Sequence, residues 1–417
     1  MKQVLIIGYV WPEPSSSAAG TRMMQLLRLF PTPDYSLTFA TTAIVTPFCE
    51  NLEKLGIQTK QIELNNPSFD SFIKELDPSI VIYDRFMMEE QFGWRVTAHC
   101  PQAITVLDTE DLHFLRNYRE KKYKEPALER SFLKNSDLAK REISSIYRCD
   151  LSLIISEKEM EMLKNEFFIP ENLLFYLPFL LDPITSEQEK ESPDFDSRKN
   201  FISIGNFKHA PNVDAVQFLK NDIWPLIHME IPDAKLLIFG AYPTAKINSL
   251  NDPKNNFLIK GRIEDAAEAV RSARVSLAAL RFGAGLKGKL IEAMQNGTPT
   301  VTTPVGAEGI NANLPWNGSI ATTAQDFAEA AVNLYRSQKD WTVAVKNGYR
   351  IINSRFNRSV FQETFFEVLE NLEKNLEHHR LQNFTGLLLK HHYSRSTYFL
   401  SKYIELKNQK EKTSREV

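Results

Sequence analysis

Cysteine is scarce in this sequence. Its 417 residues contain three cysteines, Cys49, Cys100 and Cys149, which stand far apart and show neither metal-site nor redox-motif spacing. Their positions exclude a disulfide-rich scaffold and favour a protein of a reducing compartment.

An excess of charge of either sign is also missing. The 50 lysines and arginines nearly balance 52 aspartates and glutamates, for a net charge of −2, and this argues against a nucleic-acid partner. No apolar run approaches the ~18 residues of a membrane span. The apolar run in the opening segment, MKQVLIIGYVWPEPSSS, is too short for the hydrophobic region of a secretory signal. We therefore expect a soluble, cytoplasmic protein.

Short apolar runs alternate with amphipathic stretches along most of the chain, which predicts parallel sheets with crossover helices. A polar segment without apolar periodicity interrupts this pattern, so we expect a domain at 1–182, a linker at 183–200, a second domain at 201–356 and a C-terminal extension at 357–417. The fold class is α/β, with two Rossmann-like domains facing each other across a cleft and function in the loops after the strands. The expected strands are Val4–Gly8, Leu37–Ala40, Ile80–Tyr83, Ile104–Leu107, Leu151–Ile155, Phe201–Gly205, Ala234–Gly240, Phe257–Lys260, Val275–Leu280, Thr300–Thr303 and Ser319–Ala321.

Several segments of the second half carry a family resemblance. In order along the chain, they read FISIGNFKHAPNVDAVQFLKNDIWPLI, PDAKLLIFG, NFLIKGRIED and LRFGAGLKGKLIEAMQNGTPTVTTPVGAEGI. This half resembles the donor-binding domain of GT-B glycosyltransferases, most closely the bacterial group 1 branch in family 4 of the retaining enzymes. Weaker agreement in the first half comes from WPEPSSSAAGTR, VLDTEDLHFLRNYRE and IYRCDLSLIISEKEMEML. The resemblance implies a GT-B fold and sugar transfer from a nucleotide sugar with retention.

The loop RFGAGLKGKLIEAM fits such a donor by its chemistry. A nucleotide sugar presents a ribose diol and a diphosphate, so its site needs a carboxylate and cationic or N–H donors. Gly283 and Gly285 let the backbone approach closely, and a helix starting near Lys287 directs free amides at the diphosphate. The resemblance implies that Glu292 binds the ribose.

This loop departs from the family pattern at one position. The loop that begins with Gly205 departs from it at another. Ala284 stands where the family has a glutamate near the transferred sugar, and Asn206, after Gly205, stands where the family has a diphosphate-binding arginine. Lys208 follows in that second loop. We infer that Lys287 and Lys289 supply part of the missing positive charge, although solvated residues at a helix start would look the same. The other donor-side candidates are Gly205, Asn206 and Lys208.

Two more positions enter through the resemblance. It implies that the backbone near Ile263 borders the nucleobase. Gly20 opens an amphipathic helix and is a candidate for the acceptor or phosphate side, with a plain loop-to-helix turn as the alternative.

Asp108 and His113 are the catalytic candidates of the first half. Asp108 ends an apolar strand and His113 follows five residues later, where a carboxylate or imidazole could orient or deprotonate an acceptor hydroxyl. A turn cap and a satisfied histidine are the ordinary alternatives. No spacing of a metal site is visible, so we expect no metal and no cofactor, with the nucleotide sugar as substrate.

The C-terminal extension is predicted to contain a helix at 361–376, and the resemblance to GT-B proteins implies that its helices cross back to the first domain. Residues 378–417 then combine eight basic with three acidic side chains, a net of 8 − 3 = +5, and carry interleaved aromatic residues. Such a segment suits peripheral contact with an anionic membrane at the inner face of the cell membrane. A helix packed on the first domain is the alternative.

These observations favour a glycosyltransferase that acts on a glycan or lipid-linked acceptor in cell-surface polysaccharide or glycolipid synthesis. Two alternatives stay open: a catalytically silent GT-B scaffold or sugar-nucleotide-binding protein, suggested by Ala284 and Asn206, and a GT-B sugar-nucleotide epimerase.

Overall fold

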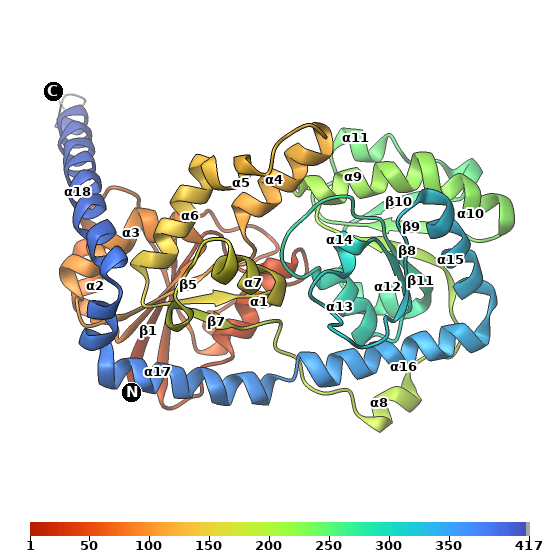
Figure 1. Ribbon diagram of the computed structural model, residues 1–417, viewed down its shortest axis with the longest axis horizontal. Coiled ribbons are helices and arrows are strands. Elements are labelled where there is room, and N and C mark those ends of the chain that lie inside the picture. The colour runs from red at the N-terminus through yellow and green to blue at the C-terminus, as the bar shows by residue number, and fades with distance from the viewer. Residues whose placement is uncertain (414–417) are drawn as a thin grey trace.

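The computed structural model describes residues 1–413 and contains two parallel sheets, one in each half of the chain (Figure 1). The first sheet has seven strands in the order β3-β2-β1-β4-β5-β6-β7, and every pairing is parallel. Its strands are β1 (Lys2–Gly8), β2 (Tyr35–Thr41), β3 (Gln58–Gln61), β4 (Ile80–Asp84), β5 (Ile104–Asp108), β6 (Leu151–Ile154) and β7 (Leu174–Tyr176). Its helices are α1 (Ala18–Leu27), α2 (Ser68–Leu76), α3 (Phe86–His99), α4 (His113–Lys124), α5 (Ser131–Asn135), α6 (Asp137–Arg148) and α7 (Glu157–Asn165).

The second sheet has six parallel strands in the order β10-β9-β8-β11-β12-β13. Its strands are β8 (Lys199–Ile204), β9 (Leu236–Phe239), β10 (Phe257–Gly261), β11 (Ala273–Ala278), β12 (Thr300–Thr302) and β13 (Gly318–Ile320). The helices of this half are α9 (Ala210–Phe218), α10 (Trp224–Glu230), α11 (Ala245–Asn248), α12 (Ala266–Ser272), α13 (Gly288–Gln295), α14 (Pro304–Ala307), α15 (Ala324–Arg336) and α16 (Gln338–Arg355). Between the sheets the chain forms only one short α-helix, α8 (Ser186–Glu191).

The strand pattern follows from burial on both faces. In β4 and β5 every residue is buried, because helices cover both sides of a doubly wound parallel sheet. The predicted α/β class with two Rossmann-like domains is confirmed. The sequence pattern missed two edge strands: β3 reads QTKQ, is largely exposed and shows no apolar run, and β7 (LFY) is only three residues long.

The last helices return to the first domain. Figure 1 shows α16 along the second domain, followed by α17 (Arg358–Gln382) along the first and α18 (Phe384–Thr413) rising beside α3. Four residues of α17 lie in the same apolar cluster as Val4 and Ile6 of β1, which closes one face of the first sheet; they are Phe365, Leu369, Leu372 and Leu376.

Helix α18 packs on the first domain through polar groups. The guanidinium of Arg95 in α3 donates to Ser401 Oγ (2.9 Å) and to Glu405 Oε1 (2.5 Å), and both partners are buried. Positions 414–417 of the predicted basic segment lie outside the described residues. Within residues 1–413 no helix is both long and apolar enough to cross a bilayer.

Candidate functional site

The carboxyl ends of the two sheets are joined by hydrogen bonds between loops. The loop after β1 contacts the loops after β8, β9 and β10 of the second domain, the last through Arg262 Nη2 to Ser15 Oγ (3.1 Å), and α4 and α7 contact the loops after β11 and β12. The bonds are Asn206 Nδ2 to Ser16 O (3.1 Å), Tyr242 OH to Glu13 Oε2 (2.9 Å), Gly285 N to Glu159 Oε1 (2.8 Å), and Arg119 to Gly283 O (2.8 Å) and Glu308 Oε1 (2.7 Å). Loops at the carboxyl ends of open parallel sheets are where such folds bind ligands, so this junction is the candidate site.

The loop between β11 and α13 is fixed by glycine geometry. Gly285 has a φ of +63°, and a Cβ there would lie 2.7 Å from Cβ of Asp111 in the other domain. Glycine is therefore required both for the left-handed backbone and for the close approach of the two domains. Gly283, with φ of +153°, lies two residues earlier, and its carbonyl accepts the bond from Arg119.

Two helices of the second domain start at this junction without a side-chain cap. His209 precedes α9 and Lys287 precedes α13, and neither side chain bonds to the first turn. The other helices that begin in this domain's loops have such caps, namely Thr244, Asp265, Thr303, Thr323 and Ser337. The uncapped first turns of α9 and α13 present amide donors and the positive end of the helix dipole, which suits an anionic ligand.

Lys289 connects the loop after β8 with α13. Its ammonium donates to Asn212 Oδ1 (2.7 Å) and lies 2.7 Å from the position that a Cβ on Gly205 would take. Burial lowers the pKa of Lys289 to about 8, while the nearby Glu292 acts in the opposite direction. The structure thus brings Gly205, Lys289 and Glu292 together, as a diphosphate and ribose site would require.

Lys287 points elsewhere. Its ammonium donates to the carbonyl of Gly285 (2.7 Å). Burial lowers the pKa of Lys287 to about 8, against the attraction of Glu308. The two lysines therefore diverge from the start of α13: Lys289 faces the loop after β8, and Lys287 faces the junction with the first domain.

Glu292 lies in the second turn of α13 and is half-buried. Burial raises its pKa to about 7, the Asp265 carboxylate adds to this rise, and Lys289 opposes it. Ile263 lies half-buried in the turn between β10 and α12, three residues before Ala266 starts that helix. The assignment of Ile263 to a nucleobase stays a prediction.

The loop after β8 is ordered by its own side chains. Besides its bond to the first domain, Asn206 accepts the amide of Lys208 through Oδ1 (2.9 Å) and the side chain of Asn212 through its carbonyl (2.8 Å). The exposed Lys208 places its ammonium 3.5 Å from the ring centroid of Tyr242. Asn206 therefore joins the two domains, and Lys208 lies over an aromatic ring.

Asp108 is fully buried at the end of β5, in contact with a cation. Arg22 of α1 donates to its Oδ1 through Nε (3.1 Å) and Nη2 (2.8 Å), whereas Oδ2 is buried without a partner. This pairing gives Asp108 a structural partner that sequence reasoning missed. Its catalytic assignment stays a prediction.

His113 begins α4 in the first domain, and the charge of His209 of the second domain acts on it. Its Nε2 is 3.6 Å from Asp111 Oδ1, and its ring meets Phe86 edge to face at 5.6 Å. Burial lowers the pKa of His113 to about 3, despite the opposite influence of Asp111, so the imidazole is neutral near pH 7. Gly20 lies in α1, where a Cβ would meet the backbone of Glu13 at 2.4 Å, so packing alone requires glycine there.

Arginines and glutamates of the first domain complete the junction, and the sequence reasoning did not single them out. Arg119 binds Glu308 through both oxygens (2.7 and 2.8 Å), and Arg116 binds Asp111. The two arginines are three residues apart and therefore share one face of α4. This spacing is visible in the sequence and could have predicted a shared basic face. Glu159 has no comparable signal, because acids in a helix usually face solvent.

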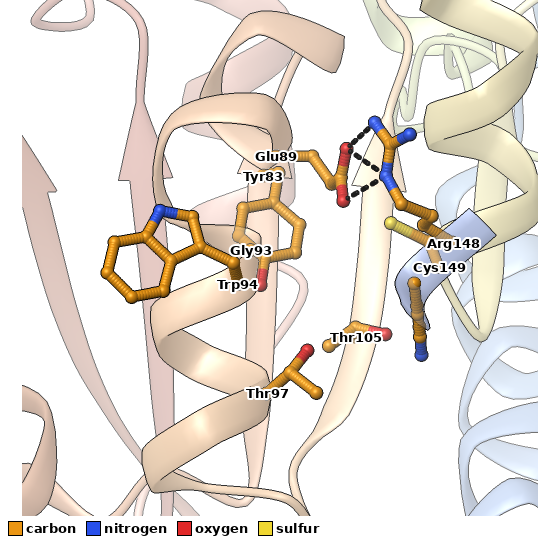
Figure 2. Close-up of a pocket in the computed structure, with 9 residues that line it drawn as sticks. Tyr83, Glu89, Gly93, Trp94, Thr97, Thr105, Arg148 and Cys149 are labelled. Atoms are coloured by element: carbon orange, nitrogen blue, oxygen red, sulfur yellow. Dashed lines mark hydrogen bonds and ion pairs between the residues drawn. The ribbon is translucent and has the colours of Figure 1, made fainter. Parts of the chain in front are cut away.

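A separate pocket lies within the first domain (Figure 2). It is lined by residues of β4, β5, α3, α6 and α18, among them Tyr83, Cys149 and Lys390, and Figure 2 shows Glu89 paired with Arg148. Glu89 and Arg148 neutralise each other inside the pocket, and Lys390 lines it from α18. Among residues 1–413, no group of three histidine, cysteine, aspartate or glutamate side chains could hold a metal ion.

Comparison with known proteins identifies the second domain. Residues 198–337 match the family described as glycosyl transferases group 1. A 44.6 kDa protein from the cps region of Klebsiella pneumoniae is 24% identical over 237 residues, and the match spans 55% of this chain and 58% of that protein. The chain thus matches less than two-thirds of that relative's length.

Solved structures resemble the whole fold at low sequence identity. HepE from Anabaena in complex with UDP-glucose has a TM-score of 0.65 at 12% identity, covering 89% of this chain and 100% of that one. Sucrose-phosphate synthase from Thermosynechococcus elongatus has a TM-score of 0.64 at 15% identity, covering 89% and 99%. WaaG, a glycosyltransferase of lipopolysaccharide biosynthesis, has a TM-score of 0.58 at 12% identity, covering 87% and 98%. The predicted GT-B fold is confirmed, and the second domain is similar to the group 1 glycosyltransferases over residues 198–337.

Proposed function

We propose that this protein transfers a glycosyl group from a nucleotide sugar to a glycan or lipid-linked acceptor. The observation that carries the proposal is the grouping of uncapped helix starts, Lys289 and Glu292 around the loop of Gly283 and Gly285. Amide donors and an ammonium match a diphosphate, and a half-buried carboxylate matches a ribose diol.

The proposed pathway is the synthesis of a cell-surface polysaccharide or glycolipid. A relative encoded in a cps region and a structural neighbour from lipopolysaccharide biosynthesis support this assignment. Solved neighbours in complex with UDP or UDP-glucose support a nucleotide sugar as donor.

The chemistry expected of these residues is positioning and stabilisation of charge. When the bond between the anomeric carbon and the diphosphate breaks, negative charge grows on the leaving oxygen, where the first turns of α9 and α13 and Lys289 can stabilise it. His113, neutral and next to the junction, is a candidate for orienting the acceptor hydroxyl. We include retention of the anomeric configuration in the proposal, because the resemblance to the retaining enzymes of family 4 implies it.

A catalytically silent sugar-nucleotide-binding scaffold is the second candidate. It is favoured by Ala284, which is 8% exposed and packs in the apolar core cluster of the first domain, leaving no carboxylate of its own in that loop. A GT-B epimerase is the third. Turnover separates both enzymes from the scaffold, and the product separates transferase from epimerase.

A binding panel tests the donor site. Isothermal titration calorimetry of the purified protein against UDP, GDP, ADP and TDP, each with a matching sugar conjugate, is expected to show binding of one base class. Transfer or hydrolysis of that sugar nucleotide is then measured by nucleotide release. Binding without turnover would favour the scaffold, and no binding to any nucleotide would overturn the donor site.

Nucleotide affinity is expected to depend on pH with a maximum between about 7 and 8. Glu292 has a raised pKa of about 7, so below this pH it becomes protonated and loses strength as an acceptor for ribose hydroxyls. Lys289 has a lowered pKa of about 8, so above this pH it loses the charge that attracts the diphosphate.

Calorimetric titrations from pH 5.5 to 9.5 check this expectation. Glu292→Gln should remove the acidic limb and Lys289→Met the basic limb. A flat profile of the unmodified protein across this range would contradict both assignments.

Helix α18 is the part of the chain that we propose for peripheral membrane contact. Its inward side carries the buried Ser401 and Glu405, whereas apolar residues at helical spacing face outward; these are Phe384 (65% exposed), Leu388 (46%), Phe399 (68%), Tyr403 (66%) and Leu406 (58%). The net positive charge of residues 378–417 complements anionic lipids.

Replacing Phe399 and Tyr403 together by alanine is expected to weaken binding to phosphatidylglycerol-containing vesicles at least about tenfold, because each ring would lose apolar burial worth about 1 kcal/mol or more. Vesicle co-sedimentation measures this loss, with Met229→Ala/Val343→Ala, two exposed residues of the second domain, as the control. Equal sedimentation with anionic and with neutral vesicles would contradict the proposal.

A further inference from the structure

Glu159 is a carboxylate of the first domain that reaches the donor loop of the second. It lies in α7, and its Oε1 accepts the amide of Gly285 at 2.8 Å and the amide of Leu112 at 3.1 Å. One oxygen therefore holds the loop after β5 and the loop after β11 together.

The second oxygen of Glu159 has no partner. Oε2 is buried without a hydrogen bond, the residue is 0% exposed, and none of the ion pairs among the described residues includes it. An unpaired buried carboxylate is costly, and burial together with the nearby Asp111 raises the pKa of Glu159 to about 7. Because burying a carboxylate is costly and Oε2 has no partner, we take Oε2 as an acceptor for a ligand.

The surroundings of Oε2 indicate where such a ligand lies. Asp111, whose Cβ is near Gly285, and Lys287, which donates to the carbonyl of Gly285, are charged neighbours of Glu159. Arg22 and Glu142 of the first domain are two more. Ala284 directly precedes the bonded amide and has no polar side chain. The carboxylate at this end of the donor loop is thus supplied by α7 of the other domain.

We propose that Glu159 is a sugar-positioning residue, in which Oε1 fixes the donor loop and Oε2 accepts a hydroxyl of the transferred sugar. This inference rests on the proposed function. Lys289 and Glu292, which contact the nucleotide in that proposal, belong to the second domain, whereas the sugar contact comes from the first. Nucleotide binding and sugar binding therefore depend on different residues and can be separated by mutation.

Glu159→Gln is the decisive variant. Its amide oxygen still accepts from Gly285 and Leu112, while an NH₂ group, which can only donate, replaces Oε2. The loop is therefore retained, and the hydrogen bond donated by the sugar hydroxyl is lost. We expect the sugar nucleotide to bind about tenfold more weakly, with less than about threefold change for the free nucleoside diphosphate, in line with one lost hydrogen bond to a charged group.

The unmodified protein is first titrated calorimetrically with four pairs: UDP and UDP-glucose, GDP and GDP-mannose, ADP and ADP-glucose, and TDP and TDP-glucose. The variants are then titrated with the pair that the unmodified protein binds. Glu157→Gln is the matched control, because Glu157 lies on the same helix and also bridges the domains, to Arg355 (2.7 Å), away from the donor loop. It should change neither affinity.

The outcomes separate the inference from the function on which it rests. Equal weakening of both ligands by Glu159→Gln would show that Glu159 only supports the loop, and no weakening would show that it does not contact the sugar; either result overturns the inference and leaves the donor site intact. An unmodified protein that binds no member of the panel overturns the proposed function itself.

Discussion

Nucleotide binding is expected to fall about 150-fold when Glu292 is replaced by alanine. The carboxylate of a ribose-binding glutamate accepts hydrogen bonds from two hydroxyls, and hydrogen bonds to a charged group contribute about 1.5–3 kcal/mol each. Because the contacts are partly replaced by water, a loss of about 3 kcal/mol is reasonable. Glu292→Gln, which keeps one acceptor oxygen, should lose about half of that free energy.

The loss is measured by calorimetry with the nucleoside diphosphate that binds most tightly in the panel. Glu329→Ala is the control, because this glutamate is exposed on α15 of the same domain and its carboxylate accepts from Gln325 of the same helix. A change of less than about threefold in Glu292→Ala, with the fold retained by circular dichroism, would remove Glu292 from the donor site.

The sequence predicted the features that depend on local pattern. Short, mostly apolar runs predicted β4, β5, β8 and β11, because strands covered on both faces are rich in apolar residues. The glycines before α13 and the lysines at its start marked the loop between β11 and α13 as a candidate ligand site, because a left-handed backbone and an uncapped helix start leave a signature in one short segment.

Features that depend on the partner domain left no such signature. Glu159 reads as an ordinary surface acid of an amphipathic helix, and only the tertiary structure places it beneath Gly285. Gly285 itself was predicted as a glycine that lets the backbone approach a ligand. Its close approach to Asp111 of the other domain is a second reason why glycine is needed there. In α18 the polar Ser401 and Glu405 face inward, opposite to the usual pattern, because Arg95 supplies the partner.

The free energy of unfolding of the first domain is expected to fall by about 3–5 kcal/mol in Arg22→Met. Removing one member of a buried ion pair leaves the other as an uncompensated charge, and here Asp108 is fully buried. The carbonyls of Leu177 and Pro178 would also lose their donor. Urea denaturation measures the change, with Arg336→Ala in an exposed pair as the control, expected within about 0.5 kcal/mol.

The double variant Arg22→Met/Asp108→Leu separates the structural role of Asp108 from the catalytic one. Replacing both members of a buried pair by apolar residues of similar volume is often nearly neutral, so most of the lost stability should return. Turnover in this stable variant then tests the catalytic role alone. Unchanged turnover would show that Asp108 serves only as the partner of Arg22. Lost turnover with unchanged nucleotide affinity would indicate that Asp108 acts on the acceptor hydroxyl. A loss below about 1 kcal/mol in Arg22→Met would contradict the premise that this pair is structurally important.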